Sequence, residues 1–160
     1  MKKLLILLTL IIVSAGVASA SSSLYSHKEF EQAVQMIKKY ETLHTAKHWP
    51  LIGYGHKVQP GEKYKPGDVL SEKEADALLR KDLKKLVGMY KNYGKDALLL
   101  GVLAYNVGIG RVNRSSLVQM LKDGNRNIRD VYTSFCKYKG KEHKGIKSRR
   151  VEELSVLYRA

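Results

Sequence analysis

The sequence ETLHTAKHWPLIGYGH, residues 41–56, marks a change in the periodicity of the chain. Before it, apolar residues recur at helical spacing; at its end, two glycines flank a tyrosine, which is typical of a strand or a tight turn. Glu41 is the only carboxylate between Glu31 and Glu62. We therefore expect a helix that ends at a single acidic residue, followed by a short connection into a strand.

Two capping boxes predict the starts of two amphipathic helices. Ser26 and Ser71 are each followed three residues later by a glutamate, and such pairs satisfy the free backbone N–H groups of a first helical turn. Apolar residues follow at helical spacing. We therefore predict helices over residues 27–40 and 72–90.

A small hairpin region is predicted between these two helices. Residues 53–58 and 64–70 would form its arms, with the turn at Pro60-Gly61. Pro66 marks an edge or a break in the second arm.

The rest of the chain has mainly helical patterns. Residues 96–107 are apolar almost all round, which predicts a central buried helix that ends before Gly108. Further helices are predicted from a cap at Ser116 to about 123–124, over 127–138 and over 148–157. The whole is an α+β fold, a mainly helical domain with a small N-terminal sheet.

The first twenty residues have the pattern of a secretory signal peptide. A positively charged start precedes the apolar residues 4–13 and the small-residue cleavage site Ala18-Ser19-Ala20. The apolar run is shorter than the about 20 residues of a membrane span, although an uncleaved anchor is the alternative. We expect residues 1–20 to be removed and residues 21–160 to form one secreted or periplasmic domain, with no stable membrane insertion.

The chain is strongly basic. Its net charge of +14 falls to +12 without residues 1–20, which contain two lysines and no acid. This charge attracts polyanions such as the cell wall, lipid headgroups or nucleic acid, and does not choose among them. Cys136 is the only cysteine, so no intrachain disulfide can form, and we expect it to be a small buried hydrophobe.

Five motifs follow one another in an order that indicates a protein family. They are Glu41 after the first helix, Gly53-Tyr54-Gly55-His56, Lys65-Pro66-Gly67 leading into residues 70–79, Tyr105-Asn106-Val107-Gly108, and residues 145–153 with the pair Arg149-Arg150. Over nearly all of residues 21–160 the chain resembles glycoside hydrolase family 24, the phage-type lysozymes or muramidases. The resemblance implies a lysozyme-like fold, in which a small β-hairpin lobe faces a helical lobe across a cleft. It also implies a structural pair between His56 and Asp82.

Glu41 is the candidate general acid of such an enzyme. The resemblance implies cleavage of peptidoglycan between N-acetylmuramic acid and N-acetylglucosamine, and this reaction needs an acid that protonates the leaving oxygen. Burial under Trp49 or Leu51 would favour a protonated carboxyl, whereas nearby lysines and histidines would oppose it. A solvated charge at a frayed helix end is the alternative.

The partners that the family usually places after this acid are missing. Pro50 stands nine residues after Glu41, where an Asp or Cys is typical, and Leu51 precedes the glycine motif, where a Thr is usual. Thr45 and His48 are the available substitutes: a hydroxyl can hold a water, and a neutral imidazole can act as its base. A chance surface loop is the alternative. Because no second carboxylate lies nearby, a single-acid route, as in lytic transglycosylases, is also open.

Three further side chains are candidates for substrate binding. His44, Trp49 and Tyr54 would form a sugar-stacking surface, although Tyr54 would equally well pack inward. Gly53 and Gly55 would allow the backbone to approach a sugar chain or another strand.

We expect no metal, because the histidines lack partners at metal-ligand spacing, and no cofactor. The basic stretch from Lys137 to Arg150 has three interpretations, a solvated face, an anchor for anionic peptide stems, and a nucleic-acid surface. Export argues against a nucleic-acid partner, so we expect peptidoglycan to be the partner. We also expect the protein to be a monomer. A non-catalytic wall-binding module and an exported nucleic-acid binder are the rival functions.

Overall fold

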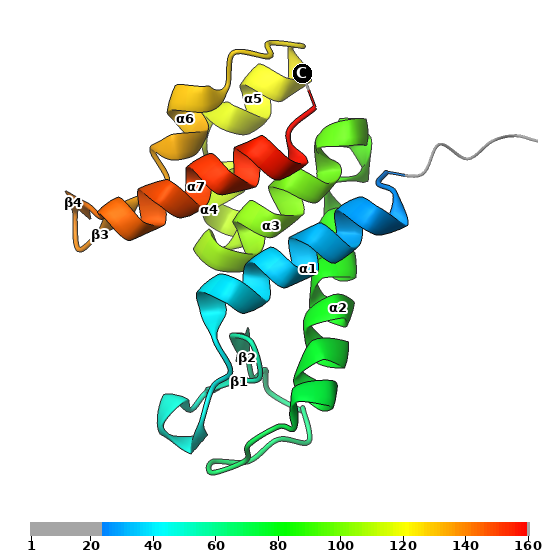
Figure 1. The fold of residues 1–160 in the computed structure, drawn as a ribbon, viewed down its shortest axis with the longest axis vertical. Coiled ribbons are helices and arrows are strands. Elements are labelled where there is room, and N and C mark those ends of the chain that lie inside the picture. Colours follow the sequence, from blue (N-terminus) through cyan, green and yellow to red (C-terminus); the bar gives the residue numbers. More distant parts are fainter. Residues whose placement is uncertain (1–23, 160) are drawn as a thin grey trace, which may run out of the picture.

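The computed structural model describes residues 24–159, so the signal peptide expected over residues 1–20 lies outside the described part. Seven α-helices make up most of it (Figure 1): α1 (His27–Glu41), α2 (Glu72–Met89), α3 (Ala97–Val107), α4 (Ile109–Asn113), α5 (Ser116–Lys122), α6 (Arg129–Thr133) and α7 (Lys144–Leu157). Two antiparallel strand pairs are β1 (Leu51–Ile52) with β2 (His56–Lys57), and β3 (Lys137–Tyr138) with β4 (Lys141–Glu142). Short 3-10 helices cover Ala46–His48 and Lys91–Asp96. The expected mainly helical α+β class is confirmed.

Both predicted capping boxes are present and start the two longest helices. The Ser26 hydroxyl accepts the Glu29 N–H, while the Glu29 carboxylate accepts the Ser26 N–H. Ser71 and Glu74 repeat this exchange at the start of α2. Helices α1 and α2 therefore begin where the sequence predicts.

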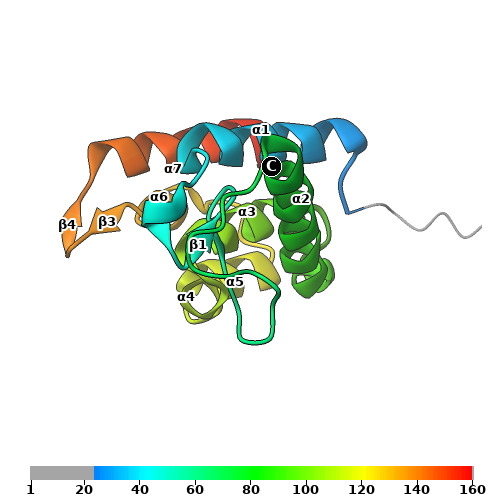
Figure 2. The same cartoon turned by 90° about the horizontal axis from the view of Figure 1, so that it is seen from below.

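The apolar helix α3 is the centre of the core. All its residues from 97 to 104 are buried, as their apolar character predicts. Helix α2 packs so closely on it that a methyl group on Gly101 would lie 2.6 Å from Val87 Cγ2. Helices α1 and α7 lie along one side of the molecule (Figure 2). Each fully buried Leu or Ile side chain here contributes about 1.5–3 kcal/mol to the stability of the folded state. Within residues 24–159, no helix is long and apolar enough to cross a membrane.

The N-terminal hairpin is smaller than predicted. Strands β1 and β2 pair Leu51 with Lys57 and Ile52 with His56, and residues 64–70 form no strand. Gly53 and Gly55 have φ values of 56° and 93°, a left-handed region that favours glycine, so the chain reverses inside the predicted first arm.

The C-terminal region also departs from the prediction. The helix expected over 127–138 ends at Thr133, and an unpredicted hairpin follows, with Lys139 and Gly140 at φ 47° and 80° in a two-residue turn. Helix α7 begins four residues before the predicted 148, where the His143 ring accepts the Ile146 N–H.

Two smaller expectations in this region have different outcomes. Helix α5 is preceded by Ser115 rather than Ser116, and neither serine side chain caps it. Cys136 is buried, as expected.

Candidate active site

Glu41 is the last residue of α1 and lies beside the hairpin. Its side chain is 20% exposed. A methyl group on Gly55 would lie 3.5 Å from Glu41 Oε2, so the close backbone approach expected of this glycine is to the acid itself. The next residue, Thr42, has φ 51° and ψ 164°, a region that is occupied almost only by glycine. The chain thus leaves α1 abruptly, directly after the acid.

The two oxygens of Glu41 have different surroundings. Oε1 accepts a hydrogen bond from Arg149 Nη1 at 2.6 Å and another from Asn106 Nδ2 at 3.0 Å. Oε2 accepts no hydrogen bond from any residue among 24–159. Because a carboxyl proton is held best on the oxygen that accepts no other donor, Oε2 is the oxygen suited to carry one.

Glu41 belongs to a closed ring of charged and polar side chains. Arg149 Nε donates to Glu153 at 2.9 Å, and Arg150 Nη1 donates to the other Glu153 oxygen at 2.5 Å. Arg150 Nη2 donates to Asn106 Oδ1, which fixes the Asn106 amide so that its NH₂ group faces Glu41. Arg150 and Glu153 are fully buried. Buried charges of this kind persist only when each is paired, and here two cations balance two carboxylates.

Arg149 is charged despite its burial. Burial lowers the pKa of Arg149, but Glu153 and Glu41 outweigh this and raise that pKa above its ordinary value. The Arg149 guanidinium lies 5.2 Å from the centre of the Tyr40 ring. Arg149 and Arg150 are therefore not part of a solvated basic face, which corrects this part of the sequence interpretation.

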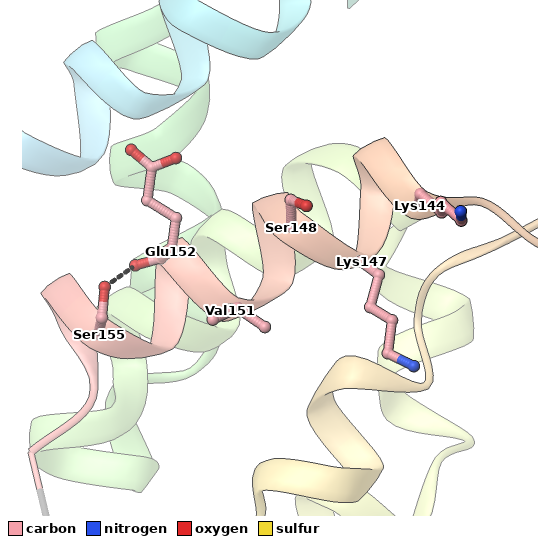
Figure 3. A pocket seen from close by; sticks show the side chains of 6 residues that line it. All are labelled: Lys144, Lys147, Ser148, Val151, Glu152 and Ser155. Atoms are coloured by element: carbon pink, nitrogen blue, oxygen red, sulfur yellow. Dashed lines mark hydrogen bonds between the residues drawn. The ribbon is translucent and has the colours of Figure 1, made fainter.

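A second contact fixes the end of α1 to α7. The Tyr40 hydroxyl donates to Glu152 at 2.5 Å, and Lys39 Nζ lies 2.8 Å from the same carboxylate. Figure 3 shows Glu152 pointing from α7 toward α1. Burial, together with Glu152, raises the pKa of Tyr40 to about 12, so its hydroxyl stays a donor. The helix that ends in Glu41 is held by α7 at three successive residues, Lys39, Tyr40 and Glu41.

The sequence analysis placed Asn106 and Glu153 only in their motifs, and Arg149 in a motif and in the basic stretch, and it assigned none of them to the surroundings of Glu41. The spacing of Arg149 and Glu153 is the i,i+4 spacing of a helical ion pair, which was a usable signal. The contacts of Asn106 and Arg149 with Glu41 span 65 and 108 residues, and no local pattern indicates them.

Thr45 and His48 form a local pair on the connection between α1 and β1. His48 Nδ1 accepts the Thr45 N–H at 2.9 Å and lies 3.2 Å from the Thr45 hydroxyl. Because a backbone N–H always donates, the proton of the neutral imidazole is on Nε2. The basic nitrogen of His48 is therefore occupied, whereas the exposed Thr45 hydroxyl keeps free lone pairs.

The three candidate substrate-binding residues differ in their exposure to solvent. Tyr54 is only 6% exposed; its hydroxyl donates to Glu72 at 3.3 Å, and Lys38 Nζ lies 5.1 Å from its ring centre. Tyr54 thus packs inward and forms no sugar-stacking surface. Trp49 and His44 are half-buried, and the His44 ring lies 3.1 Å from the Gly53 carbonyl.

His56 lies between two carboxylates. Its Nδ1 is 2.6 Å from Asp82, the partner that the resemblance implied, and its Nε2 is 2.9 Å from Glu62, which the sequence analysis did not identify. The hydrogen bond with Asp82 raises the pKa of His56 above its ordinary value; burial opposes this rise and Glu62 adds to it. The His56 ring joins the loop after β2 to α2.

A hollow of about 340 Å³ separates the hairpin lobe from the helices. Gly55 and His56 line it from the hairpin, Asp82 and Met89 from α2, and Tyr105 from α3. Glu41 does not line this hollow; it lies beside Gly55, which does. Among the described residues, no group of three metal-ligating side chains is found.

Known proteins are similar to this chain in sequence. The phage lysozyme family profile matches residues 28–153. The endolysin of Bacillus phage B103 is 34% identical over 132 residues, 75% of this chain and 47% of that protein; the endolysin of Bacillus phage PZA is 32% identical over 130 residues, 76% and 48% of the two chains. This chain thus spans about half the length of these phage relatives.

Solved structures show the same fold. The muramidase domain of SpmX from Asticaccaulis excentricus superposes with a TM-score of 0.66 at 23% identity, covering 81% of this chain and 96% of that domain. The endolysin of Escherichia coli O157:H7 phage FAHEc1 gives a TM-score of 0.65 at 22% identity, covering 79% and 90%. The fold is lysozyme-like, and from the profile that matches most of its length, this chain belongs to the phage lysozyme family.

Proposed function

We propose that this protein cleaves the glycan strands of peptidoglycan between N-acetylmuramic acid and N-acetylglucosamine, with Glu41 as the general acid. The observation that carries the proposal is the asymmetry of the Glu41 carboxylate. Arg149 and Asn106 hold Oε1, while Oε2, which lies beside Gly55, is free to deliver a proton. Protonation of the leaving oxygen is the step that glycosidic cleavage requires.

Within residues 24–159, the ring around Glu41 offers no second carboxylate that reaches solvent. Glu153 is the other carboxylate of the ring, but it is fully buried and accepts hydrogen bonds from Arg149, Arg150 and Tyr132. It has no access to water and cannot serve as a base or a nucleophile. The water or hydroxyl group that attacks the sugar carbon must therefore be positioned without a second carboxylate.

Hydrolysis with Thr45 as the water-positioning group is the proposed route. The Thr45 hydroxyl is exposed and lies 3.2 Å from His48 Nδ1, which already accepts the Thr45 N–H, so the hydroxyl oxygen can accept a hydrogen bond from an attacking water. As the water oxygen bonds to the sugar carbon that the leaving oxygen departs from, the second proton of the water passes to solvent, and solvent returns a proton to Glu41. Thr45 keeps the water-holding role that the sequence analysis gave it, and His48, whose Nδ1 accepts the Thr45 N–H, is left without the role of a base.

The missing second carboxylate favours one other candidate, a lytic transglycosylase. In that reaction a hydroxyl of the sugar itself displaces the leaving group after Glu41 has protonated it, so no water needs to be held. The product is an anhydro sugar, which is one water lighter than the hydrolysis product.

Mass analysis of muropeptides from purified sacculi tests both candidates. Products that carry an added water support hydrolysis, and anhydro products support transglycosylation. Glu41→Gln should release neither product. The matched control Glu74→Gln should release the same product as the parent and in the same amount, because glutamine also completes a capping box. Binding to sacculi without any product from the parent protein would leave only the non-catalytic wall-binding module.

We also propose that the protein acts outside the cytoplasm as a monomer, after removal of residues 1–20. Support comes from the signal pattern and from the wall substrate proposed above. Intact-mass measurement of the protein from its native cells and sedimentation analysis would test these points. A mature chain that still carries residues 1–20 would replace this proposal with an N-terminal anchor.

A further inference from the structure

The β3–β4 hairpin projects from one end of the helical lobe (Figures 1 and 2). Phe135 and Cys136 before it are buried, and residues 137–145 are nine consecutive exposed residues. Lys139 occupies a left-handed turn position that asparagine or glycine would fill at lower cost. The active site uses none of these residues. We call residues 137–144 the cationic hairpin.

The charges of the cationic hairpin are largely uncompensated. Its carboxylate, Glu142, is paired with Lys147 at 3.0 Å. Tyr138 is 58% exposed, with Lys139 Nζ 5.5 Å from its ring centre. Among residues 24–159, no carboxylate lies within ion-pair distance of the four lysines Lys137, Lys139, Lys141 and Lys144.

Hollows with cationic edges lie on both sides of this hairpin. One of about 340 Å³ is lined by Arg111 of α4 and Lys137, together with Ser115, Ser116 and Ser134, and no carboxylate lines it. The other, an open hollow of about 580 Å³, runs along α7; Lys144 and Lys147 project at one end of it (Figure 3), and Glu152 also lines it. Cations therefore extend from α4 across the hairpin to α7.

We propose that the cationic hairpin and these two hollows bind a linear polyol phosphate polymer attached to the wall glycan. The groups present suit phosphodiesters: lysines act as point charges, an arginine offers a fork of donors, and serine hydroxyls donate hydrogen bonds. A chain with one negative charge per repeat fits cations spread over a ridge and two hollows better than a single compact anion does.

Distance from the acid favours a polymer that is attached to the glycan. Helix α7 carries Lys144 at its first residue and Arg149, the partner of Glu41, five residues later, a rise of about 7.5 Å. A glycan in the cleft and a polymer linked to it can therefore contact both places at once. The second contact would raise the effective concentration of substrate at Glu41, so this inference rests on the proposed function.

Binding of soluble poly(glycerol phosphate) tests the inference in a Glu41→Gln background. The triple variant Lys137→Gln, Lys139→Gln, Lys141→Gln is compared with Lys73→Gln, Lys91→Gln, Lys122→Gln, which removes three exposed lysines elsewhere. Both variants lose three charges from the net +14. At equal salt, the hairpin variant should bind at least about tenfold more weakly, with a shallower salt dependence, while the control changes by less than about twofold. Equal weakening in both would overturn the inference.

Three further ligands distinguish the proposed polymer from other anionic partners. Phosphatidylglycerol vesicles, duplex DNA and polyglutamate should show little hairpin-dependent binding. Preference for any of them over poly(glycerol phosphate) would replace the proposed polymer with a membrane, a nucleic acid or a carboxylate chain.

Activity with native Glu41 separates this inference from the proposed function. The hairpin variant should cleave walls that carry the polymer more slowly, and stripped walls at the parental rate. If the hairpin variant cleaved both kinds of wall at the parental rate, the hairpin would have no role in wall cleavage. If no protein cleaves either wall while hairpin-dependent polymer binding persists, the proposed function fails and the binding surface stands.

Discussion

Arg149 Nη1 lies 2.6 Å from Glu41 Oε1, while Nε of the same guanidinium lies 2.9 Å from Glu153. One side chain thus joins the partly exposed acid to a fully buried carboxylate. The position of Glu41 is consequently set by the core of the helical lobe and not by the hairpin across the cleft. The acid is fixed before any substrate binds.

Replacing Arg149 should therefore damage both stability and activity. We expect Arg149→Gln to lower the free energy of unfolding by about 3–5 kcal/mol, because it leaves buried Glu153 with one cation fewer. Arg149→Lys should lose less stability but still lose turnover, because one ammonium cannot bridge Glu41 and Glu153.

Urea unfolding and turnover on sacculi measure these effects. The control, Arg129→Lys, changes an exposed arginine and should stay within about 0.5 kcal/mol of the parent. An Arg149→Lys variant with full turnover would show that the bridge does not position the acid.

The His56 cluster predicts a dependence of stability on pH. Since Asp82 and Glu62 raise the pKa of His56 from its ordinary 6.5, its contribution is complete below about pH 6.5 and is lost as pH rises through the raised value. The stability difference between the parent and His56→Asn should then be largest near pH 5–6 and should shrink in alkaline solution.

A double-mutant cycle of His56→Asn and Asp82→Asn checks the cause. Coupling between the two residues at pH 5–6 should exceed coupling at high pH. Absence of coupling at low pH would refute the pairing in solution.

Local sequence signals predicted only part of this molecule. The two capping boxes located α1 and α2, and the apolar run located α3, because these features depend on neighbours in the chain. The β3–β4 hairpin was missed because both of its faces are exposed, so its lysines show no apolar alternation.

Glu41 could be selected as a candidate from the sequence, but its surroundings could not be predicted. Glu41 was identifiable from its isolation and from the family motifs. Arg149 and Asn106 reach it only through the packing of α3 and α7 against α1, and Glu62 reaches His56 through an irregular loop.

Thr42 gives a prediction about backbone strain. Its positive φ beside the acid costs on the order of 1–3 kcal/mol, which glycine would relieve at a cost of up to about 1 kcal/mol in unfolded-chain entropy. We expect Thr42→Gly to be more stable than the parent in thermal unfolding, while Thr42→Ala, which is strained in the same way, is not. A destabilised glycine variant would contradict this strain.

The proposed water-positioning role predicts different losses at two neighbouring residues. Thr45→Ala should lower turnover by about 10² to 10⁴, and His48→Ala by less, because only the Thr45 hydroxyl would contact the water. Thr45→Ser should retain most of the turnover, and wall binding should be unchanged in all three variants. Full turnover in both alanine variants, with anhydro products, would favour the transglycosylase instead.

The most direct test of the central claim compares Glu41→Gln on two leaving groups. An acid that protonates the leaving oxygen is needed for a natural glycan but far less for an activated aryl glycoside, whose leaving group departs without a proton. We predict that Glu41→Gln loses about 10² to 10⁴ in turnover on sacculi and retains most of its turnover on a dinitrophenyl glycoside of the same sugar chain. Equal losses on both substrates, or full activity on sacculi, would contradict Glu41 as the general acid.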